Sequence, residues 1–342
     1  MSDGPAEPRP SRSKLDAASR AAEAVGLGWL LRRRSPGVAC LVYHRVGTPG
    51  PDGWDPTVFE AGIEQFDAQM GFISRSFDVV GPEDLEEIVA RRRRGRHVLI
   101  TFDDGYRDSY EHGFRLVRKH GLKATFFITS GFLDDRTISW WDQISGMVRR
   151  TERREVRVPG RERPPVSLEP AVVPEAVRIL TSAYKELPAA ETDAFLDELA
   201  ERLGTDRAWP GDDPWMTWDT VREMRAAGMT IGGHTATHPV LARLPAERQR
   251  EEILISKARL EEELGEPMRW FSYPVGARDT FAPETQAVLR EAGVELAFSY
   301  YGGSPRRDRW DPLDVPRRGV VRNASLAYFR MALTLPDLYP NR

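Results

Sequence analysis

The sequence predicts an α/β fold in which parallel strands form a sheet or barrel with helices on its outside. From Val38 onward, short apolar segments alternate with longer amphipathic segments. This repetition of strand and helix is typical of units whose strands pair in parallel. The 342 residues, of which 40% are hydrophobic, suffice for one large α/β domain with additions or for two ordinary domains.

The expected strands are short apolar runs, at residues 38–44, 77–80, 97–102, 123–129, 229–233, 269–273, 294–300 and 319–321. Helices are expected between them. Gly121 and Gly228 each follow an amphipathic segment, and glycine is a common stop at a helix C-terminus. Pro283 opens a further helical segment, in the first-turn position that proline tolerates.

The N-terminus differs in composition from the rest of the chain. Residues 1 to about 20 are polar and proline-rich, so we expect them to be disordered. Residues 21–34 are apolar with a basic end, which predicts an amphipathic helix packed on the domain, or else one in peripheral contact with an anionic membrane surface. We therefore divide the chain into a tail and helix at 1–37 and a main domain at 38–342.

The N-terminus does not resemble a secretory signal. No apolar run approaches the ~20 residues that a membrane span requires. These two features predict a cytoplasmic location.

Residues from about 145 to 215 interrupt the alternation of strands and helices. They carry several prolines, no strong strand, and helical runs such as PEAVRILTSAYKEL and AETDAFLDELAERLG. We expect a helical insertion in the barrel. The sequence leaves open whether it forms a lid, a substrate wall or only additional packing.

Charge and cysteine content exclude some classes of site. The formal charge of -3 gives no global field that would attract nucleic acid, and the basic run at 91–97 has no interleaved aromatic residues. Cys40 is the single cysteine, so an intramolecular disulfide and a thiolate metal cluster are both excluded. We expect Cys40 to be a small buried residue, and the oligomeric state is not predicted.

Two aspartates follow an apolar run in the segment VLITFDDGYRD, residues 98–108. Adjacent carboxylates at a strand end are costly unless a positive group neutralises them. Neighbouring side chains of a strand point to opposite sides, so Asp103 and Asp104 can have different roles. A hairpin turn at Asp104-Gly105 is the alternative explanation.

A second segment, IGGHTATHPVL, places His234 and His238 four residues apart after a short strand. This spacing lets two imidazoles converge on one point, and with a carboxylate they form a set that binds a catalytic divalent metal. The alternative is one helix-capping and one surface histidine.

The ends of parallel strands lie on the same rim of a barrel, where α/β barrels place their sites. We therefore expect Asp104 to join His234 and His238 as a metal ligand and Asp103 to act as general base on a metal-activated water. Zinc is the expected ion, although cobalt, nickel or iron also suit this ligand set.

TFDDGY together with HTATH resembles the polysaccharide deacetylase family, the NodB-homology group of metal-dependent carbohydrate esterases. The segments LVYHRV (41–46), FFITSGFL (126–133) and RWFSYPVG (269–276) extend the resemblance, which covers about 38–138 and 215–322. It implies a distorted (β/α)7 barrel that hydrolyses the acetamide of N-acetylated sugars. A backbone N–H of the PVG segment near Tyr273 is then expected to hold the oxyanion.

The sequence departs from the family pattern at two positions. Ser272 stands where many members have an arginine paired to the catalytic aspartate, and Arg317 is a candidate replacement or a surface ion pair. No histidine follows His238, although many members take their general acid from a C-terminal histidine. His44 is the expected substitute, with a structural core histidine as the alternative.

Aromatic residues in these motifs are candidates for substrate contact. Tyr106 and Tyr273 are expected to line the pocket, and Trp141 or its neighbour Trp140 to stack on a sugar face, although core packing is the commoner role of such residues.

The leading hypothesis is removal of N-acetyl groups from amino sugars of a polysaccharide, an oligosaccharide or a glycan precursor. The alternatives are hydrolysis of another amide, such as a cyclic imide or ureide, and a barrel that binds glycan without turnover.

Overall fold

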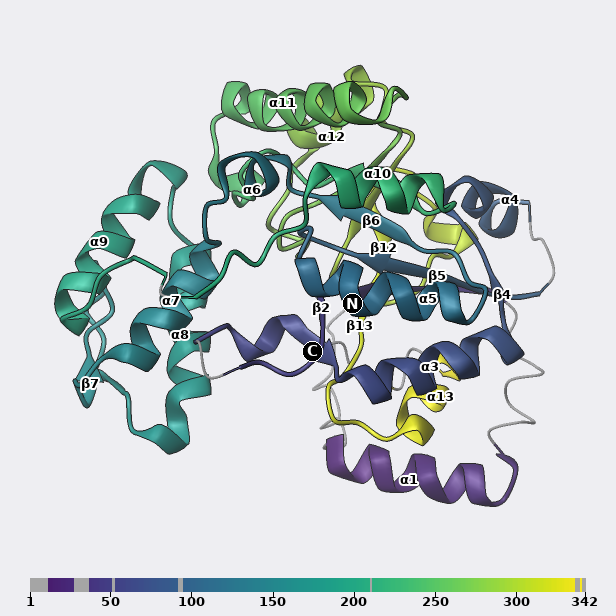
Figure 1. Ribbon diagram of the computed structural model, residues 1–342, viewed down its shortest axis with the longest axis horizontal. Coiled ribbons are helices and arrows are strands. Elements are labelled where there is room, and N and C mark those ends of the chain that lie inside the picture. The colour runs from purple at the N-terminus through teal and green to yellow at the C-terminus, as the bar shows by residue number, and fades with distance from the viewer. Residues whose placement is uncertain are drawn as a thin grey trace, which may run out of the picture.

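The computed structural model describes residues 12–27, 37–50, 53–91, 95–209, 211–335 and 339. Within them a parallel sheet curls into a nearly closed barrel with helices around it (Figure 1). The predicted barrel with outer helices is therefore confirmed.

The barrel strands follow one another in the spatial order β12-β11-β10-β9-β6-β5-β1-β13. Their bounds are β1 Gly37–Tyr43, β5 Arg96–Phe102, β6 Thr125–Ile128, β9 Thr230–Gly233, β10 Trp270–Ser272, β11 Leu296–Ser299, β12 Val315–Pro316 and β13 Arg318–Gly319, with β4 Asp78–Val79 added beside β5. The two ends of this order, β12 and β13, are joined by the single residue Arg317. They therefore act as one interrupted strand that closes the ring by pairing with β11 on one side and β1 on the other.

Helices surround the barrel and fill the long connections. They are α1 Arg12–Ala24, α3 Ile63–Ser76, α4 Leu85–Val89, α5 Arg115–Lys119, α6 Ser130–Asp135, α7 Trp140–Arg150, α8 Val173–Lys185, α9 Thr192–Leu203, α10 Trp218–Ala226, α11 Ala246–Leu264, α12 Pro283–Glu291 and α13 Leu326–Thr334. Three smaller pieces complete the fold: the β2–β3 pair (Arg45–Val46 and Phe59–Ala61), the β7–β8 hairpin (Glu155–Val156 and Val166–Ser167) and a π-helical turn at Ser109–Phe114.

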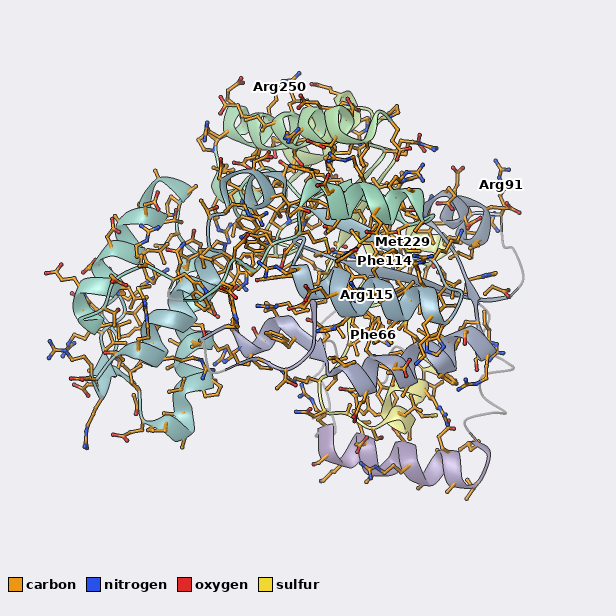
Figure 2. The ribbon with its side chains drawn as sticks, viewed as in Figure 1. Phe66, Arg91, Phe114, Arg115, Met229 and Arg250 are labelled. Carbon is orange, nitrogen blue, oxygen red and sulfur yellow. The ribbon has the colours of Figure 1, made fainter. Side chains whose placement is uncertain are left out.

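The alternation of side chains along β5 separates two hydrophobic clusters. Leu99 belongs to the cluster inside the barrel, with Cys40 and Phe127, whereas Ile100 and its alternate neighbours face the helices. On the helices, apolar side chains such as Phe66 lie in the interior, whereas Arg250 lies at the edge of the molecule (Figure 2). Cys40 is a buried free cysteine, as expected.

The N-terminal prediction is wrong for residues 12–20, which belong to helix α1 rather than to a disordered tail. Tertiary contacts with α13 and its C-terminal neighbourhood explain the helix. The Asp16 carboxylate accepts the backbone N–H of Ser325, 3.2 Å away, and the Ser19 hydroxyl lies 2.6 Å from the Tyr339 hydroxyl. The predicted helix at 21–34 ends at Ala24, and residues 28–36 lie outside the described part of the chain.

The segment between α6 and α10 holds α7, α8, α9 and the β7–β8 hairpin, which lie together on one side of the barrel (left in Figure 1). Its aromatic residues pack on one another, with Trp140 stacked on Tyr184 at 4.2 Å between ring centroids. Trp209, from the same segment, lies 3.9 Å from the Trp54 ring beside the β2–β3 pair. We call residues 140–209 the helical segment; they largely coincide with the expected insertion.

Within the described residues, none of the helices combines the length and the apolar character that crossing a bilayer requires.

Gly232 on β9 tests how tightly the barrel packs behind the predicted metal motif. A Cβ at this position would lie 2.7 Å from a Phe127 ring carbon and from the Trp270 carbonyl oxygen. We expect Gly232→Ala to lower the free energy of unfolding by about 1–3 kcal/mol in urea denaturation, because β6 and β10 must move apart.

The matched control is Gly62→Ala, because a Cβ there would meet nothing within 4 Å and its φ is −70°. It should change the free energy of unfolding by less than about 1 kcal/mol. Equal effects of the two substitutions would contradict the packing argument.

Candidate active site

The two adjacent aspartates leave the end of β5 in different directions. Asp103 continues the inward phase of Leu99 and Thr101, and its backbone N–H donates to the Tyr43 carbonyl on β1 at 2.9 Å. Asp104 takes a left-handed backbone conformation with φ 77°, followed by Gly105 with φ 97°. This turn sends the second carboxylate toward a different set of partners. The two aspartates are separated as expected, but by the turn at Asp104-Gly105 and not by strand alternation, because β5 ends at Phe102.

Asp103 is held inside the barrel by a bidentate ion pair with Arg317. Both guanidinium–carboxylate contacts are 2.8 Å, from Nη1 to Oδ1 and from Nη2 to Oδ2. The Ser272 hydroxyl completes the group, 3.1 Å from Asp103 Oδ2 and 2.7 Å from Arg317 Nη2. Arg317 is fully buried, so the structure places it in this pair and not in a surface ion pair.

The electrostatics of Asp103 follow from this pairing. Burial alone would raise the pKa of the carboxyl, but the Arg317 guanidinium, together with His234, outweighs burial and holds the pKa well below its usual range. The carboxylate is therefore ionised throughout the physiological pH range.

Asp104, His234 and His238 converge from the ends of two strands. Asp104 Oδ1 lies 3.3 Å from His234 Nε2 and 3.5 Å from His238 Nε2, and all three ligand atoms lie within 4.8 Å of one another. All three residues are buried, and Asp104 Oδ1 has no hydrogen-bond partner among the described residues. A buried acceptor without a donor, faced by two imidazole nitrogens, fits a divalent metal ion.

The backbone around the two histidines fixes their orientation. His234 Nδ1 lies 2.7 Å from the Ser272 carbonyl, which leaves Nε2 toward Asp104. His238 has φ 59°, and its backbone N–H donates to the Thr235 hydroxyl at 3.0 Å. Burial lowers the pKa of His238 to about 3, so its imidazole is neutral, the form that binds metals.

His44 lies on the same rim, directly after β1, and is held by the fully buried Glu60 of β3. His44 Nδ1 is 3.1 Å from Glu60 Oε1, and the His44 backbone N–H donates to Glu60 Oε2 at 2.7 Å. Burial alone would lower the pKa of His44, but the Glu60 carboxylate outweighs it and raises the pKa to about 9. At neutral pH the imidazole therefore carries a proton.

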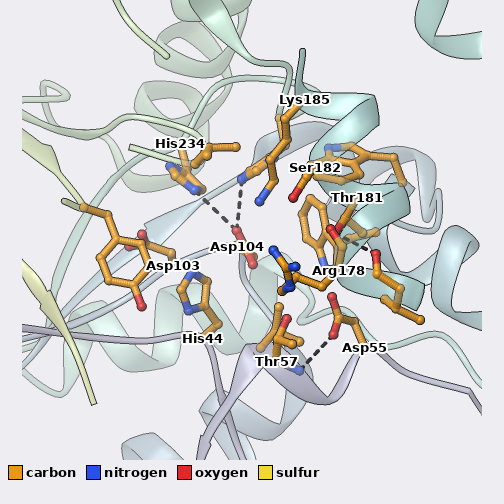
Figure 3. Close-up of a pocket in the computed structure, with 17 residues that line it drawn as sticks. His44, Asp55, Thr57, Asp103, Asp104, Arg178, Thr181, Ser182, Lys185 and His234 are labelled. Atoms are coloured by element: carbon orange, nitrogen blue, oxygen red, sulfur yellow. Dashed lines mark hydrogen bonds and ion pairs between the residues drawn. The ribbon is translucent and has the colours of Figure 1, made fainter. Parts of the chain in front are cut away.

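These side chains line a cavity of about 440 Å³ between the barrel rim and the helical segment (Figure 3). The barrel contributes His44, Asp103, Asp104, His234, His238, Val275 and Tyr300. The opposite wall comes from Asp55, Thr57 and Val58 and from Trp140, Trp141, Val177, Arg178, Thr181, Ser182 and Lys185.

The three aromatic candidates have different positions. Trp141 lines the cavity, 4.6 Å from the His238 ring, and its indole N–H donates to the Tyr106 hydroxyl at 2.7 Å. Tyr106 itself is buried behind Trp141 and donates to Asp142 at 2.8 Å. Tyr273 is also buried, and its hydroxyl donates to the Leu313 carbonyl at 2.7 Å. Neither tyrosine lines the cavity, because packing and these hydrogen bonds hold both side chains in the core.

Sequence reasoning missed Glu60 and the polar face of α8. A lone glutamate in the apolar run VFEAGI was the available signal for Glu60. Arg178, Ser182 and Lys185 recur at helical spacing, which also suits a solvated helix face, so the sequence alone gave no reason to direct them toward the site.

The chain is similar in sequence to known polysaccharide deacetylases. A profile of the polysaccharide deacetylase family matches residues 90–156 and 182–297, more than half of the chain. The Bacillus subtilis (strain 168) protein YxkH, named for the same family, is 24% identical over 284 residues, which cover 82% of this chain and 71% of YxkH.

The fold of this chain resembles those of solved deacetylase structures. The Streptococcus pyogenes deacetylase PplD, in complex with acetate, superposes with a TM-score of 0.57 at 16% identity, covering 88% of this chain and 99% of PplD. IcaB from Ammonifex degensii gives a TM-score of 0.52 at 22% identity, covering 87% of this chain and 96% of IcaB. The profile match and the barrel together show that the chain belongs to the polysaccharide deacetylase family, a family of hydrolases of N-acetyl amide bonds that also includes pseudoenzymes.

Proposed function

We propose that this protein is a zinc-dependent hydrolase that removes N-acetyl groups from amino sugars of a glycan or glycan precursor. The observation that carries the proposal is the convergence of Asp103, the Asp104–His234–His238 group and His44 on one cavity. The walls also contain Trp140, Trp141 and Tyr300, and aromatic walls suit the faces of a sugar better than a small cyclic imide.

Asp104, His234 and His238 would hold the metal through one carboxylate oxygen and two imidazole nitrogens. Such an ion supplies positive charge that polarises the acetyl carbonyl and makes water a better nucleophile. Zinc accepts this set of ligands, and the neutral state of His238 supports metal binding near neutral pH.

Asp103 is proposed as the general base that takes a proton from the attacking water. Its carboxylate is ionised throughout the physiological pH range, because the Arg317 guanidinium lowers its pKa. The same pairing makes it a weak base, which suits a water already acidified by a nearby cation. Arg317 is therefore a positioning residue, and Ser272 supports the same carboxylate from β10.

His44 is proposed as the general acid that gives a proton to the leaving amine. The Glu60 carboxylate keeps the imidazole protonated, which is the state that an acid needs before the C–N bond breaks. The metal-ligand histidines cannot take this role while their Nε2 atoms are bound to an ion.

The oxyanion donor is proposed to be the Val275 N–H. Tyr273 N–H already donates to Phe298 O, Pro274 has no N–H, and Gly276 N–H donates to Pro274 O. Val275 lines the cavity in a left-handed conformation, φ 63°, at the centre of this γ-turn. Backbone strain of this kind is common where a site needs one orientation of a peptide group. Among the three aromatic candidates, Trp141 is retained as the substrate contact, and Tyr106 supports it from behind.

The metal site is tested by measuring the metal content of the purified protein. We expect about one divalent ion per chain in the wild type and none in the His234→Ala, His238→Ala double variant. His120→Ala, which removes a histidine paired with Asp67 away from the cavity, should keep the ion. A wild-type protein without metal, even after reconstitution with zinc or cobalt, would contradict the site.

The role of Asp103 is tested by acetate release from a panel of N-acetylated oligosaccharides. We expect Asp103→Asn to fold with lower stability, because Arg317 loses its charged partner, to retain metal, and to reduce kcat by at least about 100-fold, because proton transfer is lost. Asp78→Asn, which alters an exposed carboxylate on β4, should retain full activity. Unchanged turnover in Asp103→Asn would remove the general-base role.

The Glu60–His44 pair predicts a pH effect. Because the folded pKa of His44, about 9, exceeds its ordinary value of 6.5, protonation stabilises the fold below pH 6.5 and this contribution is lost as the pH rises through 9. In Glu60→Gln the largest effects that raise the pKa of His44 are lost, and burial is opposed only by the smaller effects of Asp104 and Asp103, so an NMR titration of the metal-free protein should place the pKa of His44 well below 9.

The alkaline limb of activity should move to lower pH in the same variant. The control is Glu64→Gln, which alters an exposed glutamate of the first turn of α3. If the pKa of His44 stays near 9 in Glu60→Gln, the proposed effect of Glu60 is refuted.

A further inference from the structure

We propose that helix α8 forms a subsite that binds an anionic group of the substrate. The substrate is then an N-acetylated sugar that carries a carboxylate or phosphate close to its acetamide. That the bound sugar is a substrate rests on the proposed function, whereas the anion-binding subsite depends only on the residues of the cavity wall.

The cavity-facing residues of α8 recur with the period of a helix. Arg178, Ser182 and Lys185 lie four and three residues apart, so they share one face, and all three line the cavity. Figure 3 shows Arg178 and Lys185 with their cationic ends directed from α8 into the cavity, on the side opposite His44. This wall therefore presents two cations and a hydroxyl to a ligand bound in the cavity.

Of the two cations, Lys185 is the more available to an anionic ligand, because it has no carboxylate partner among the described residues. It is half-buried, and no carboxylate lies within 4.0 Å of its ammonium in the described part of the chain, where Lys119, Lys123 and Lys257 all form ion pairs. Its ammonium lies 5.7 Å from the centroid of the Trp140 ring. Desolvation lowers the pKa of Lys185, so the cation is held in the cavity wall at an energetic cost.

Two other charged side chains of the cavity are paired within the protein. Asp103 is paired with Arg317 and His44 with Glu60. Asp55 interacts with Lys185 only at longer range, and its Oδ1 accepts the Thr57 backbone N–H at 2.8 Å. Lys185 is therefore a lining cation that is opposed only at longer range by Asp55 and has no carboxylate in direct contact among the described residues, so a ligand oxyanion can take that position.

Arg178 reinforces this wall nearer to solvent. It is exposed and forms a surface pair with Glu175, one turn earlier in α8. Surface pairs of this kind contribute little and exchange readily, so Arg178 can turn to a ligand without breaking a buried contact. A carboxylate or phosphate offers several acceptor oxygens and can contact Lys185 and Ser182 together. A neutral sugar would leave the Lys185 charge unmatched.

The test is titration calorimetry of the purified protein with three probes: N-acetylglucosamine, N-acetylglucosamine 1-phosphate and N-acetylmuramate. We expect at least one charged probe to bind tenfold or more tightly than the neutral sugar. The preference should fall in Lys185→Met, persist in Lys185→Arg, and weaken at high salt. Tighter binding of the phosphate or of the carboxylate probe assigns the source of the oxyanion.

The matched control is Lys119→Met, which removes an exposed lysine of α5 and should keep the preference. Equal affinity for all three probes, no measurable binding of the charged probes, or a preference that survives in Lys185→Met would overturn the subsite. If Lys185→Met does not fold, the salt dependence of the wild type tests the subsite instead. A preference for the charged probes that does not change with salt would overturn the subsite.

Acetate release from neutral chitin oligosaccharides is measured in parallel. If no N-acetylated substrate, neutral or charged, releases acetate, the proposed deacetylase activity is refuted, whereas the comparison of probe affinities still tests the subsite. Acetate release together with equal probe affinities would refute only the anionic substrate.

Discussion

The arrangement of the site depends on one buried ion pair, between Asp103 and Arg317. A carboxylate inside a barrel is tolerable only when a cation and hydrogen bonds neutralise it, and Arg317 and Ser272 supply both. Removing one partner of such a pair typically costs about 3–5 kcal/mol. Arg317 is also the residue that joins β12 to β13, so the residue that neutralises the Asp103 carboxylate lies at the point where the barrel closes.

Barrel closure explains how residues distant in the sequence meet. The C-terminal ends of β1, β5, β9 and β10 reach one rim, and the turns beyond them carry His44, Asp104, His234 and Val275. Asp104, His238 and Val275 all have positive φ, although none of them is a glycine. This local strain is borne by the tightly packed barrel, and it directs side chains and one peptide group into the cavity.

The helical segment turns this open rim into a cavity. The barrel supplies the groups that would perform the chemistry, whereas α7 and α8 supply aromatic and cationic groups facing them. Trp141 connects the two, since it contacts His238 on one side and is held by Tyr106 on the other. In the proposed function, chemistry and substrate choice are therefore carried by different parts of the chain.

The sequence by itself determined the features that are local: the alternation of strand and helix, the two aspartates at the end of a strand, and the paired histidines of HTATH. Backbone periodicity fixes such features within a few residues. Only the tertiary structure decided which cation neutralises Asp103, since Arg317 lies 214 residues away, and that Glu60 sets the protonation of His44. It also buried Tyr106 and Tyr273, ordered α1 against α13, and turned one face of α8 into the cavity. These outcomes depend on packing between distant segments, about which a local pattern carries no information.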